Sequence, residues 1–384
     1  MRILQVHNHY QQAGGEDVVA ASERRLLTEA GHSVDGFIVH NDTIQSLPDR
    51  LAASFRVVWS RPSYEAVRAR IRSFRPDVVH VHNFFPLISP SVFDACRAEG
   101  APVVMTLHNY RLICPGALLL RRDRICEKCV AGSPYWGAVH RCYRGSALGS
   151  LAVATMVDVH RRRGTWHKKV DRLIALTEFA RGKFIEAGLP AGKIVVKPNF
   201  VEDPVQPGER LDGPRHGALF VGRLSPEKGV QILIDAWKGV NYPLRIVGTG
   251  PLEAEIRGKA PENVSFLGQC DRMRVDAEMR RAAFLVMPST WYEGLPMTLV
   301  EAFAWDLPVV ASRIGALEEL VEEQATGLTF EAGNPADLRR AAYEMITRPI
   351  PRGNCRRYFF NHYSAAANLA RLEAIYRGVN GAYP

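Results

Sequence analysis

Short β-like runs alternate with helical stretches along almost the whole chain, and this alternation is the pattern that most restricts the fold. In the first half, Ile3–His7, Val78–Val81 and Val103–Leu107 are separated by segments long enough to form helices. The rhythm resumes in the second half, where Ala218–Val221 and Phe284–Met287 are strand candidates. Strands that alternate with helices form parallel sheets with helices on both faces. The sequence therefore predicts an α/β fold with doubly wound sheets.

The other predicted elements follow the same rhythm. A polar loop at 11–15 follows the first strand, and helices are expected at 16–30, 230–237 and 365–377. The further strand candidates are Val34–Val39, Val57-Val58, Leu173–Leu176, Leu244–Val247, Val264–Leu267 and Val309–Ser312.

A stretch rich in Pro and Gly between Pro198 and Pro214 interrupts the alternation and is the best candidate for a linker. With 384 residues, the chain is long enough for two domains. We expect Rossmann-like domains at 1–200 and 215–360, the first with a Cys-rich insertion at 110–145. The segment 361–384 is expected to be a helix that packs back on the first domain. Two such domains facing across a cleft would bind ligands between their strand ends.

The charge of the chain favours partners that carry phosphate. Lys and Arg number 49 against 40 Asp and Glu, which gives a formal net charge of +9. Such a surplus favours nucleotides, nucleic acid or an anionic membrane, without choosing between them. The first residues turn polar too early for a signal peptide, and no run reaches the ~18 apolar residues of a membrane span. We therefore expect a cytoplasmic protein, on the inner face of the membrane if it is peripheral.

The segment from Pro288 to Phe303 carries two carboxylates eight positions apart. Glu293 and Gly294 lie in a loop after a strand, and Glu301 lies inside the helix that begins near Pro296. A glycine and the free N–H groups of a first helical turn suit a phosphate, and the two carboxylates suit ligand hydroxyls. The alternative is that Glu293 only complements the helix dipole and that Glu301 is a solvated helix residue.

A basic loop follows the strand that ends at Val221. Arg223 and Lys228 flank the start of the next helix in Gly222-Arg223-Leu224-Ser225-Pro226-Glu227-Lys228-Gly229. Two cations at such a position can neutralise a pyrophosphate leaving group. The alternative, an exposed basic turn, is weakened by the carboxylate motif expected at the same sheet edge.

These two segments resemble the signature of glycosyltransferase family 4, whose members are retaining, nucleotide-sugar-dependent enzymes of the GT-B fold. The resemblance extends over essentially the whole chain. It implies that Glu293, with Gly294 and Leu295, contacts the donor sugar and diphosphate, and that Glu301 hydrogen-bonds the ribose hydroxyls. It also implies that Arg223 and Lys228 bind the donor phosphates.

The resemblance assigns roles to three further loops. The Gly14-Gly15 pair approaches the diphosphate, Gly248 and Gly250 form a nucleotide-side loop, and His108 lies beside the transferred sugar and β-phosphate. The alternatives are that the glycine pair is only a tight turn and that His108, at the end of the strand Val103–Leu107, is a satisfied structural histidine.

His80 and His82 flank Val81 on one strand and face the same side by alternation. They either contact the acceptor or cap the strand.

Seven cysteines include a cluster of Cys114, Cys126, Cys129 and Cys142. One Cys-x-x-Cys with two single cysteines suits a structural zinc site that staples the insertion, and four thiolates would leave no open position for catalysis. Reduced free thiols, a disulfide or redox chemistry are the alternatives. We expect no cofactor for catalysis, because the chain has no Asp-x-Asp motif for a divalent metal.

Apolar residues mark one face of a helix expected at 146–160, with Arg141 and Arg144 before it and Arg161–Arg163 after it. The predicted face consists of Leu148, Leu151, Ala152, Thr155, Met156 and Val159. An apolar helix with cations at its ends suits an anionic bilayer surface, and a core helix with a solvated end fits equally well.

We interpret the chain as a glycosyltransferase that moves a hexose from a UDP- or GDP-linked sugar to an acceptor hydroxyl. The expected acceptor is a lipid-linked saccharide in surface polysaccharide synthesis. A nucleotide-sugar epimerase of the same fold is one alternative. A zinc-containing nucleic-acid-binding protein is the other, although no aromatic stacking platform accompanies the basic runs.

Overall fold

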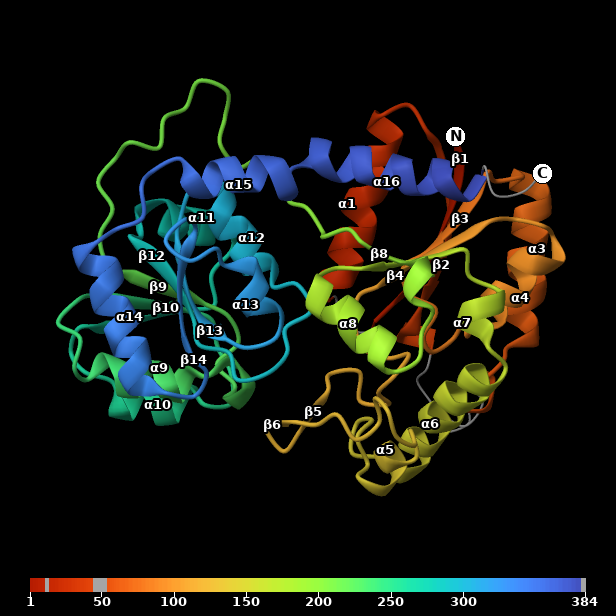
Figure 1. Ribbon diagram of the computed structural model, residues 1–384, viewed down its shortest axis with the longest axis horizontal. Helices are drawn as coiled ribbons and strands as arrows, with labels where there is room; N and C mark the ends of the chain where they lie inside the picture. Colours follow the sequence, from red (N-terminus) through yellow and green to blue (C-terminus); the bar gives the residue numbers. More distant parts are fainter. Residues whose placement is uncertain (11–13, 44–53, 381–384) are drawn as a thin grey trace. The chain divides into compact units, whose positions relative to one another are not determined.

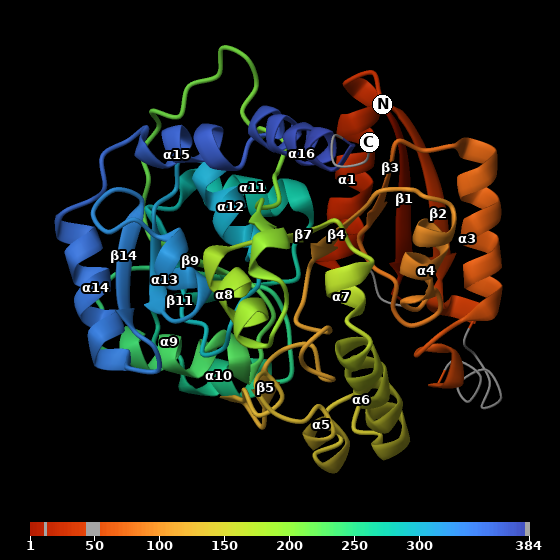
Figure 2. The same ribbon diagram turned by 45° about the vertical axis from the view of Figure 1, so that its right-hand side comes forward.

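The computed structural model describes residues 1–10, 14–43 and 54–380, so positions 11–13 of the predicted polar loop lie outside the described residues. The chain divides into two compact units. The first comprises residues 1–119, 126–198 and 368–384, and the second comprises 120–125 and 199–367. Figures 1 and 2 show that each is built around a sheet flanked by helices.

The first unit contains a six-stranded parallel sheet in the order β2-β1-β3-β4-β7-β8. Its central strands β3 and β4 are fully buried, as expected for a parallel sheet covered on both faces. The strands are β1 (Arg2–His9), β2 (Ser33–His40), β3 (Val78–Val81), β4 (Val103–Leu107), β7 (Arg172–Ala175) and β8 (Ile194–Val196).

Two helices from opposite ends of the chain cover one face of this sheet. Leu27 of α1 (Gly15–Glu29) and Leu372 and Tyr376 of α16 (Ala365–Asn380) pack in one buried cluster with strand residues such as Ile3. Helix α3 contacts the strands β1 and β2, and α4 packs on α3. The other helices named here are α3 (Arg61–Phe74), α4 (Ser91–Ala98), α5 (Trp136–Val139), α6 (Ala147–Arg162), α7 (Thr165–Lys168) and α8 (Glu178–Glu186).

The second unit repeats the architecture with a six-stranded parallel sheet in the order β11-β10-β9-β12-β13-β14. Its strands are β9 (Ala218–Val221), β10 (Leu244–Val247), β11 (Val264–Gly268), β12 (Phe284–Met287), β13 (Val309–Arg313) and β14 (Gly327–Glu331). A short antiparallel hairpin, β5 (Leu120–Arg121) with β6 (Arg124–Ile125), also groups with this unit.

The core of the second unit lies between one sheet face and the helices α9 and α14. Trp237 of α9 (Val230–Trp237) and Leu338 of α14 (Pro335–Thr347) are buried there with Phe284 and Phe330. The remaining helices are α10 (Glu253–Lys259), α11 (Arg272–Arg281), α12 (Met297–Ala304), α13 (Ala316–Leu320) and α15 (Asn354–His362).

The predicted α/β class and doubly wound sheets are confirmed, and one predicted strand is wrong. Val57 and Val58 form a turn shortly before α3, which begins at Arg61 after the N-cap Ser60 and carries Pro62 in its first turn. Two apolar residues are too few to distinguish a strand from a buried turn. The sequence interpretation also missed β8 and β14. Among the described residues, no helix has the length and hydropathy needed to cross a membrane.

Candidate functional site

The strand order of the second unit places one group of loops where a ligand would be expected. From β9 the chain moves to β10 and β11 on one side, and β12 lies on the other side of β9. In open parallel sheets, ligands bind outside the carboxyl ends of the strands at such a reversal. The loops after β9 and β12 carry Arg223, Lys228 and Glu293, so the topology gathers the two predicted motifs at this edge.

Glycines let the loops of this edge pack backbone against backbone. Gly229 has φ +67°, and a Cβ there would lie 1.8 Å from the carbonyl oxygen of Pro288. Gly248 has φ +129°, and its Cβ would lie 1.9 Å from the carbonyl oxygen of Gly222. At Gly250 a Cβ would approach the Leu224 carbonyl oxygen to 2.4 Å. A side chain at any of these positions would force the loops after β9, β10 and β12 apart.

Lys228 and Glu293, 65 positions apart in the sequence, form an ion pair at this edge. The Lys228 Nζ lies 2.6 Å from Glu293 Oε1, and the same oxygen accepts a 2.8 Å hydrogen bond from Ser289 Oγ. The ammonium also lies 5.3 Å from the centroid of the Trp291 ring. Glu293 is buried and Lys228 is half-buried. A phosphate ligand would therefore find a cation that is already oriented by a buried carboxylate.

Glu301 has a partner that the sequence did not suggest. Arg272, the first residue of α11, pairs through its guanidinium with Glu301 and also with Asp276, 3.0 Å away. Burial raises the pKa of Glu301, although Arg272 acts in the opposite direction. The carboxylate lies in α12, half-buried beside a cation. It is therefore not the freely solvated helix residue of the alternative interpretation.

The other predicted residues of this unit lie in the same loops. The Arg223 side chain is exposed and forms no ion pair or hydrogen bond with the residues that the structure describes. Gly294 is half-buried and Leu295 is buried, just before α12 begins at Met297. Arg223 is therefore available to a ligand without first breaking a bond to the described chain.

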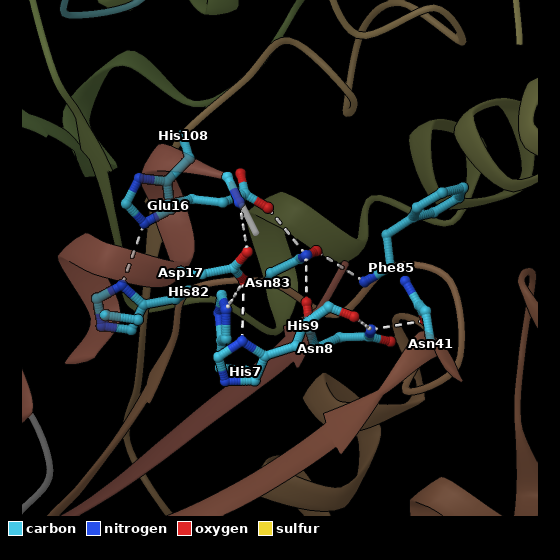
Figure 3. Close-up of polar contacts among 12 residues, drawn as sticks. His7, Asn8, His9, Glu16, Asp17, Asn41, His82, Asn83, Phe85 and His108 are labelled. Atoms are coloured by element: carbon cyan, nitrogen blue, oxygen red, sulfur yellow. Dashed lines mark hydrogen bonds and ion pairs between the residues drawn. The ribbon is translucent and has the colours of Figure 1, made fainter. Parts of the chain in front are cut away.

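The first unit has a corresponding reversal between β1 and β3, where polar side chains gather (Figure 3). The Asp17 carboxylate accepts the backbone N–H of Gly14 at 2.7 Å and caps the start of α1. Its other oxygen lies 2.7 Å from His7 Nε2 and 3.2 Å from His9 Nδ1. The predicted Gly14-Gly15 pair thus forms the N-terminal end of α1. Asp17 of the same helix holds this end against the end of β1 through His7 and His9.

Glu16 lies beside this cap and was not singled out from the sequence. Its two carboxylate oxygens accept hydrogen bonds from the side-chain amides of Asn83 at 2.9 Å and Asn109 at 3.1 Å. Burial raises its pKa to about 7, against opposing hydrogen bonds from Tyr10 and Asn109. Figure 3 shows Glu16 and His108 on the same side of the cluster. A carboxyl group that titrates near neutral pH is a candidate for contact with a ligand.

His108 follows directly after β4 and lines a cavity of about 20 Å³ with Tyr10, Asn83 and Arg111. Its Nε2 lies 3.1 Å from Nδ1 of His82, and the two rings are stacked. Burial lowers the pKa of His108 to about 3, so the ring is neutral at physiological pH.

A buried charged pair lies beneath the two histidines. Lys197, the residue after β8, pairs through its ammonium with Glu23 of α1, and both side chains are buried. The other Glu23 oxygen lies 3.3 Å from His82 Nε2. His80 instead bonds Thr106 Oγ1 at 2.8 Å and Tyr376 OH at 2.7 Å, which makes it a structural link between the sheet and α16.

Two groups of described residues bring possible metal ligands within 4.8 Å of one another: His7, His9 and Asp17, and Glu23, His80 and His82. In the first group, Asp17 already accepts a bond from the helix N-terminus. In the second, Lys197 would oppose any added cation. Hydrogen bonds and ion pairs therefore account for both arrangements.

No disulfide joins the four clustered cysteines in the described part of the chain; Cys114 and Cys129 are buried, and Cys126 and Cys142 are half-exposed. The pKa of Cys129 is raised to about 12, chiefly by burial and then by Cys114, with smaller contributions from Cys142 and Cys126. The other three thiols therefore lie close enough to Cys129 to raise its pKa. Among the described residues, no three of these sulfurs lie mutually within 4.8 Å. Their donor chemistry suits zinc, but coordination would require them to move closer.

Comparison with known proteins agrees with this geometry. Residues 3–203 match the model of Glycosyltransferase Family 4, and residues 215–348 match that of Glycosyl transferases group 1. The chain belongs to glycosyltransferase family 4. The residues that carry the sequence resemblance, from Gly222 to Phe303, fall within the second match.

Individual proteins of this type resemble the chain over part or all of its length. An uncharacterized glycosyltransferase of Methanocaldococcus jannaschii is 34% identical over 180 residues, which cover 46% of this chain and 50% of that protein. A phosphatidyl-myo-inositol mannosyltransferase of Mycobacterium leprae is 34% identical over 230 residues, covering 56% of this chain and 60% of that protein. The chain therefore spans about half the length of these curated relatives.

Among solved structures, HepE of Anabaena in complex with UDP-glucose is similar with a TM-score of 0.63 and 18% identity. The similarity covers 98% of this chain and 99% of HepE. At this identity the match supports the fold. Together with the family models, it identifies the two parallel-sheet units as those of a GT-B protein.

The raised pKa of Glu16 predicts a pH dependence of stability. The unfolded carboxyl ionises near its ordinary pKa of 4.5, whereas the folded one keeps its proton up to about 7. Stability should therefore fall as pH rises through this window and level off above it. Glu16→Gln removes the penalty, so the variant should gain stability relative to the wild type between pH 5 and 8, by about 2 kcal/mol.

Urea unfolding at pH 5 and pH 8 measures this difference. Glu29→Gln, at the exposed far end of the same helix, serves as the matched control and should follow the wild type. Parallel curves for Glu16→Gln and the wild type would show that Glu16 does not titrate in this window.

Proposed function

We propose that this protein is a retaining glycosyltransferase that transfers a hexose from a nucleoside-diphosphate sugar to an acceptor hydroxyl. The observation that carries the proposal is the Lys228–Glu293 pair at the strand-order reversal of the second unit. A cation next to a buried carboxylate offers complementary contacts to a diphosphate and to sugar hydroxyls. Arg223, exposed in the same loop, supplies a second positive charge.

The chemistry of the proposed reaction divides between these groups. Departure of the nucleoside diphosphate develops negative charge, which Lys228 and Arg223 stabilise. Glu293 accepts hydrogen bonds from the sugar, and Glu301 accepts them from the ribose, in exchange for part of its contact with Arg272. We also assign His108, Gly14 and Gly15 to donor binding, with His108 next to the transferred sugar, as the family resemblance implies. No protein side chain is assigned as general base, because the leaving phosphate itself can take the acceptor proton.

The names of similar proteins support the choice of substrates. HepE was solved with UDP and with UDP-glucose, which supports a nucleotide-sugar donor. The mycobacterial relatives are named as mannosyltransferases that act on phosphatidyl-myo-inositol, which supports an acceptor carried on a lipid. We propose a UDP- or GDP-linked hexose as donor and a lipid-linked saccharide in polysaccharide synthesis as acceptor.

Calorimetric titration with UDP and then with GDP tests the donor site. One of the two should bind selectively, and Glu301→Ala should weaken that binding about tenfold because a charged hydrogen-bond acceptor is lost. Lys228→Ala should lower turnover of the donor sugar by tenfold or more, a larger effect than the loss of stability from leaving the buried Glu293 carboxylate without its cation. No binding of either nucleotide would contradict the proposal.

A surface ion pair offers the matched control. Lys259 and Glu255 of α10 are also 2.6 Å apart, but both are exposed on the helix surface. Lys259→Ala and Glu255→Ala should leave nucleotide binding and turnover unchanged. Equal losses in both pairs would indicate a general effect of removing charge.

We also propose that the region around α5 and α6 contacts an anionic membrane surface. Leu148 and Leu151 of α6 are 71% and 45% exposed, and Trp136 and Val139 of α5 are exposed nearby in sequence. The predicted helix face is only partly available, because Met156 is buried.

The cations of this region are also not equivalent. The Arg161 guanidinium donates to the carbonyl oxygens of Gly132 at 2.8 Å and Cys129 at 3.2 Å. Arg141, Arg144 and Arg163 are exposed. They are therefore the candidates for contact with lipid phosphate.

Flotation with liposomes tests the membrane proposal. The protein should float with vesicles containing phosphatidylglycerol, and Leu148→Ser with Leu151→Ser should abolish flotation by removing exposed apolar area. Met273→Ser, which removes an 81% exposed side chain of the second unit, is the control. Flotation that persists in the double variant would exclude this surface.

Structural zinc remains a prediction for the cysteine cluster. One zinc per chain should copurify and fall to background in a Cys126→Ser, Cys129→Ser double variant, as measured by elemental analysis. Cys270→Ser removes a half-exposed thiol outside the cluster and should retain the metal. Metal-free wild-type protein that folds normally would favour the alternative of reduced thiols.

A further inference from the structure

Three polar side chains form a hydrogen-bonded row from the centre of the first sheet to its carboxyl edge. Gln5 of β1 contacts His82 after β3, and His82 contacts His108 after β4. Gln5 and His82 are 3% and 2% exposed, so water does not freely exchange their partners. Figure 3 shows the contact between His82 and His108.

The direction of each hydrogen bond in this row follows from Gln5. Its Nε2 lies 2.8 Å from the carbonyl oxygen of Ala20, which can only accept. The group at this position must therefore be the amide NH₂ and not the amide oxygen. The same nitrogen lies 3.2 Å from His82 Nε2 and can only donate to it. His82 Nε2 is consequently the unprotonated acceptor nitrogen.

A neutral imidazole carries one proton, so His82 must hold it on Nδ1. That Nδ1 lies 3.1 Å from His108 Nε2 and donates to it. His108 in turn must carry its proton on Nδ1. This nitrogen has no bonding partner within the described residues, and the His108 ring lines the cavity of about 20 Å³.

Lys197 weakens the attraction of the Glu23 carboxylate for a proton on His82 Nε2. The Glu23 carboxylate is 3.3 Å from His82 Nε2 and would otherwise attract a proton to that nitrogen. Lys197 already neutralises the carboxylate through its other oxygen. Glu23 Oε2 itself is buried without a hydrogen-bond partner among the described residues, so it competes with Gln5 for His82 Nε2. Lys197 on the other oxygen weakens that competition, and we infer that the amide, which can only donate, decides the tautomer.

We propose that Gln5 and His82 are positioning residues that fix the tautomer of His108, so that His108 presents an N–H donor rather than a lone pair. This inference rests on the proposed function only for the identity of the recipient, which would be an oxygen of the donor sugar or its phosphate. A phosphate oxygen accepts hydrogen bonds and cannot donate one when ionised. The opposite tautomer would place two acceptors against each other.

Nitrogen chemical shifts of ¹⁵N-histidine-labelled protein test the inference without any substrate, because they separate protonated from unprotonated ring nitrogens. Both His82 and His108 should be protonated at Nδ1 in the wild type. Gln5→Met removes the donor at similar volume, so Glu23 becomes the remaining partner of His82 Nε2. Both rings should then change to the Nε2–H form together, a shift of at least tenfold in the tautomer ratio.

Two further variants separate this role from packing. His82→Asn keeps an N–H near the position of Nδ1 and should leave His108 protonated at Nδ1. His80→Asn disturbs the neighbouring buried histidine, which bonds Thr106 and Tyr376 and not His108, so it should lower stability without changing the His108 tautomer. When a nucleotide sugar that the protein turns over is used as substrate, Gln5→Met should reduce kcat roughly tenfold and His82→Asn much less.

A wild-type His82 protonated at Nε2 would overturn the proposal. A His108 tautomer that stays the same in Gln5→Met would also overturn it. The expected tautomers in a protein that turns over no nucleotide sugar would instead contradict the proposed function and leave the row of hydrogen bonds established.

Discussion

Parallel strand pairing is the constraint on which both candidate sites depend. When every strand of a sheet runs in one direction, all carboxyl ends lie at one edge, and the following loops gather there. The strand order reverses between β1 and β3 in the first unit and between β9 and β12 in the second. His9, His82, Lys228 and Glu293 all lie at these reversals. Residues that are distant in sequence therefore meet because of strand order and not because of local structure.

Three charged groups of the second site are held in ion pairs, whereas the Arg223 side chain is not paired with the described residues. Lys228 is held by Glu293, and Glu301 is held by Arg272. The proposed diphosphate sugar would therefore exchange partners at Lys228 and Glu301 and make a new contact only with Arg223. Pairing holds each side chain in place and lowers the entropy lost on binding, while the ligand must compete with the existing ion pair. A ligand then binds tightly only if its own contacts replace those ion pairs, so the arrangement favours selective binding over high affinity.

Much of this arrangement could be predicted from sequence because its signals are local. β9, β12 and α12 follow from apolar periodicity, and the spacing of Lys228 and Glu293 from strand ends placed them at one edge. The sequence could not reveal that Arg272 pairs with Glu301, since an arginine at the start of a helix is commonly a surface residue. Glu23 and Lys197 are 174 positions apart, and no periodic pattern joins them. Glu16 had a weak signal, as one of two acidic residues in a first helical turn after a glycine pair.

The buried charges of the first unit require an explanation beyond stability. Taking Glu23 and Lys197 out of water has a large desolvation cost, and a well-packed apolar pair is often as stable or more stable in such a position. His80 and His82 are buried next to them, and burial lowers the pKa of each well below its usual value. A sheet that only needed to be stable would place apolar side chains at these positions. The charged pair instead leaves Gln5 as the group that decides where His82 carries its proton. The buried network thus gives up stability in return for a defined hydrogen-bond direction at His108.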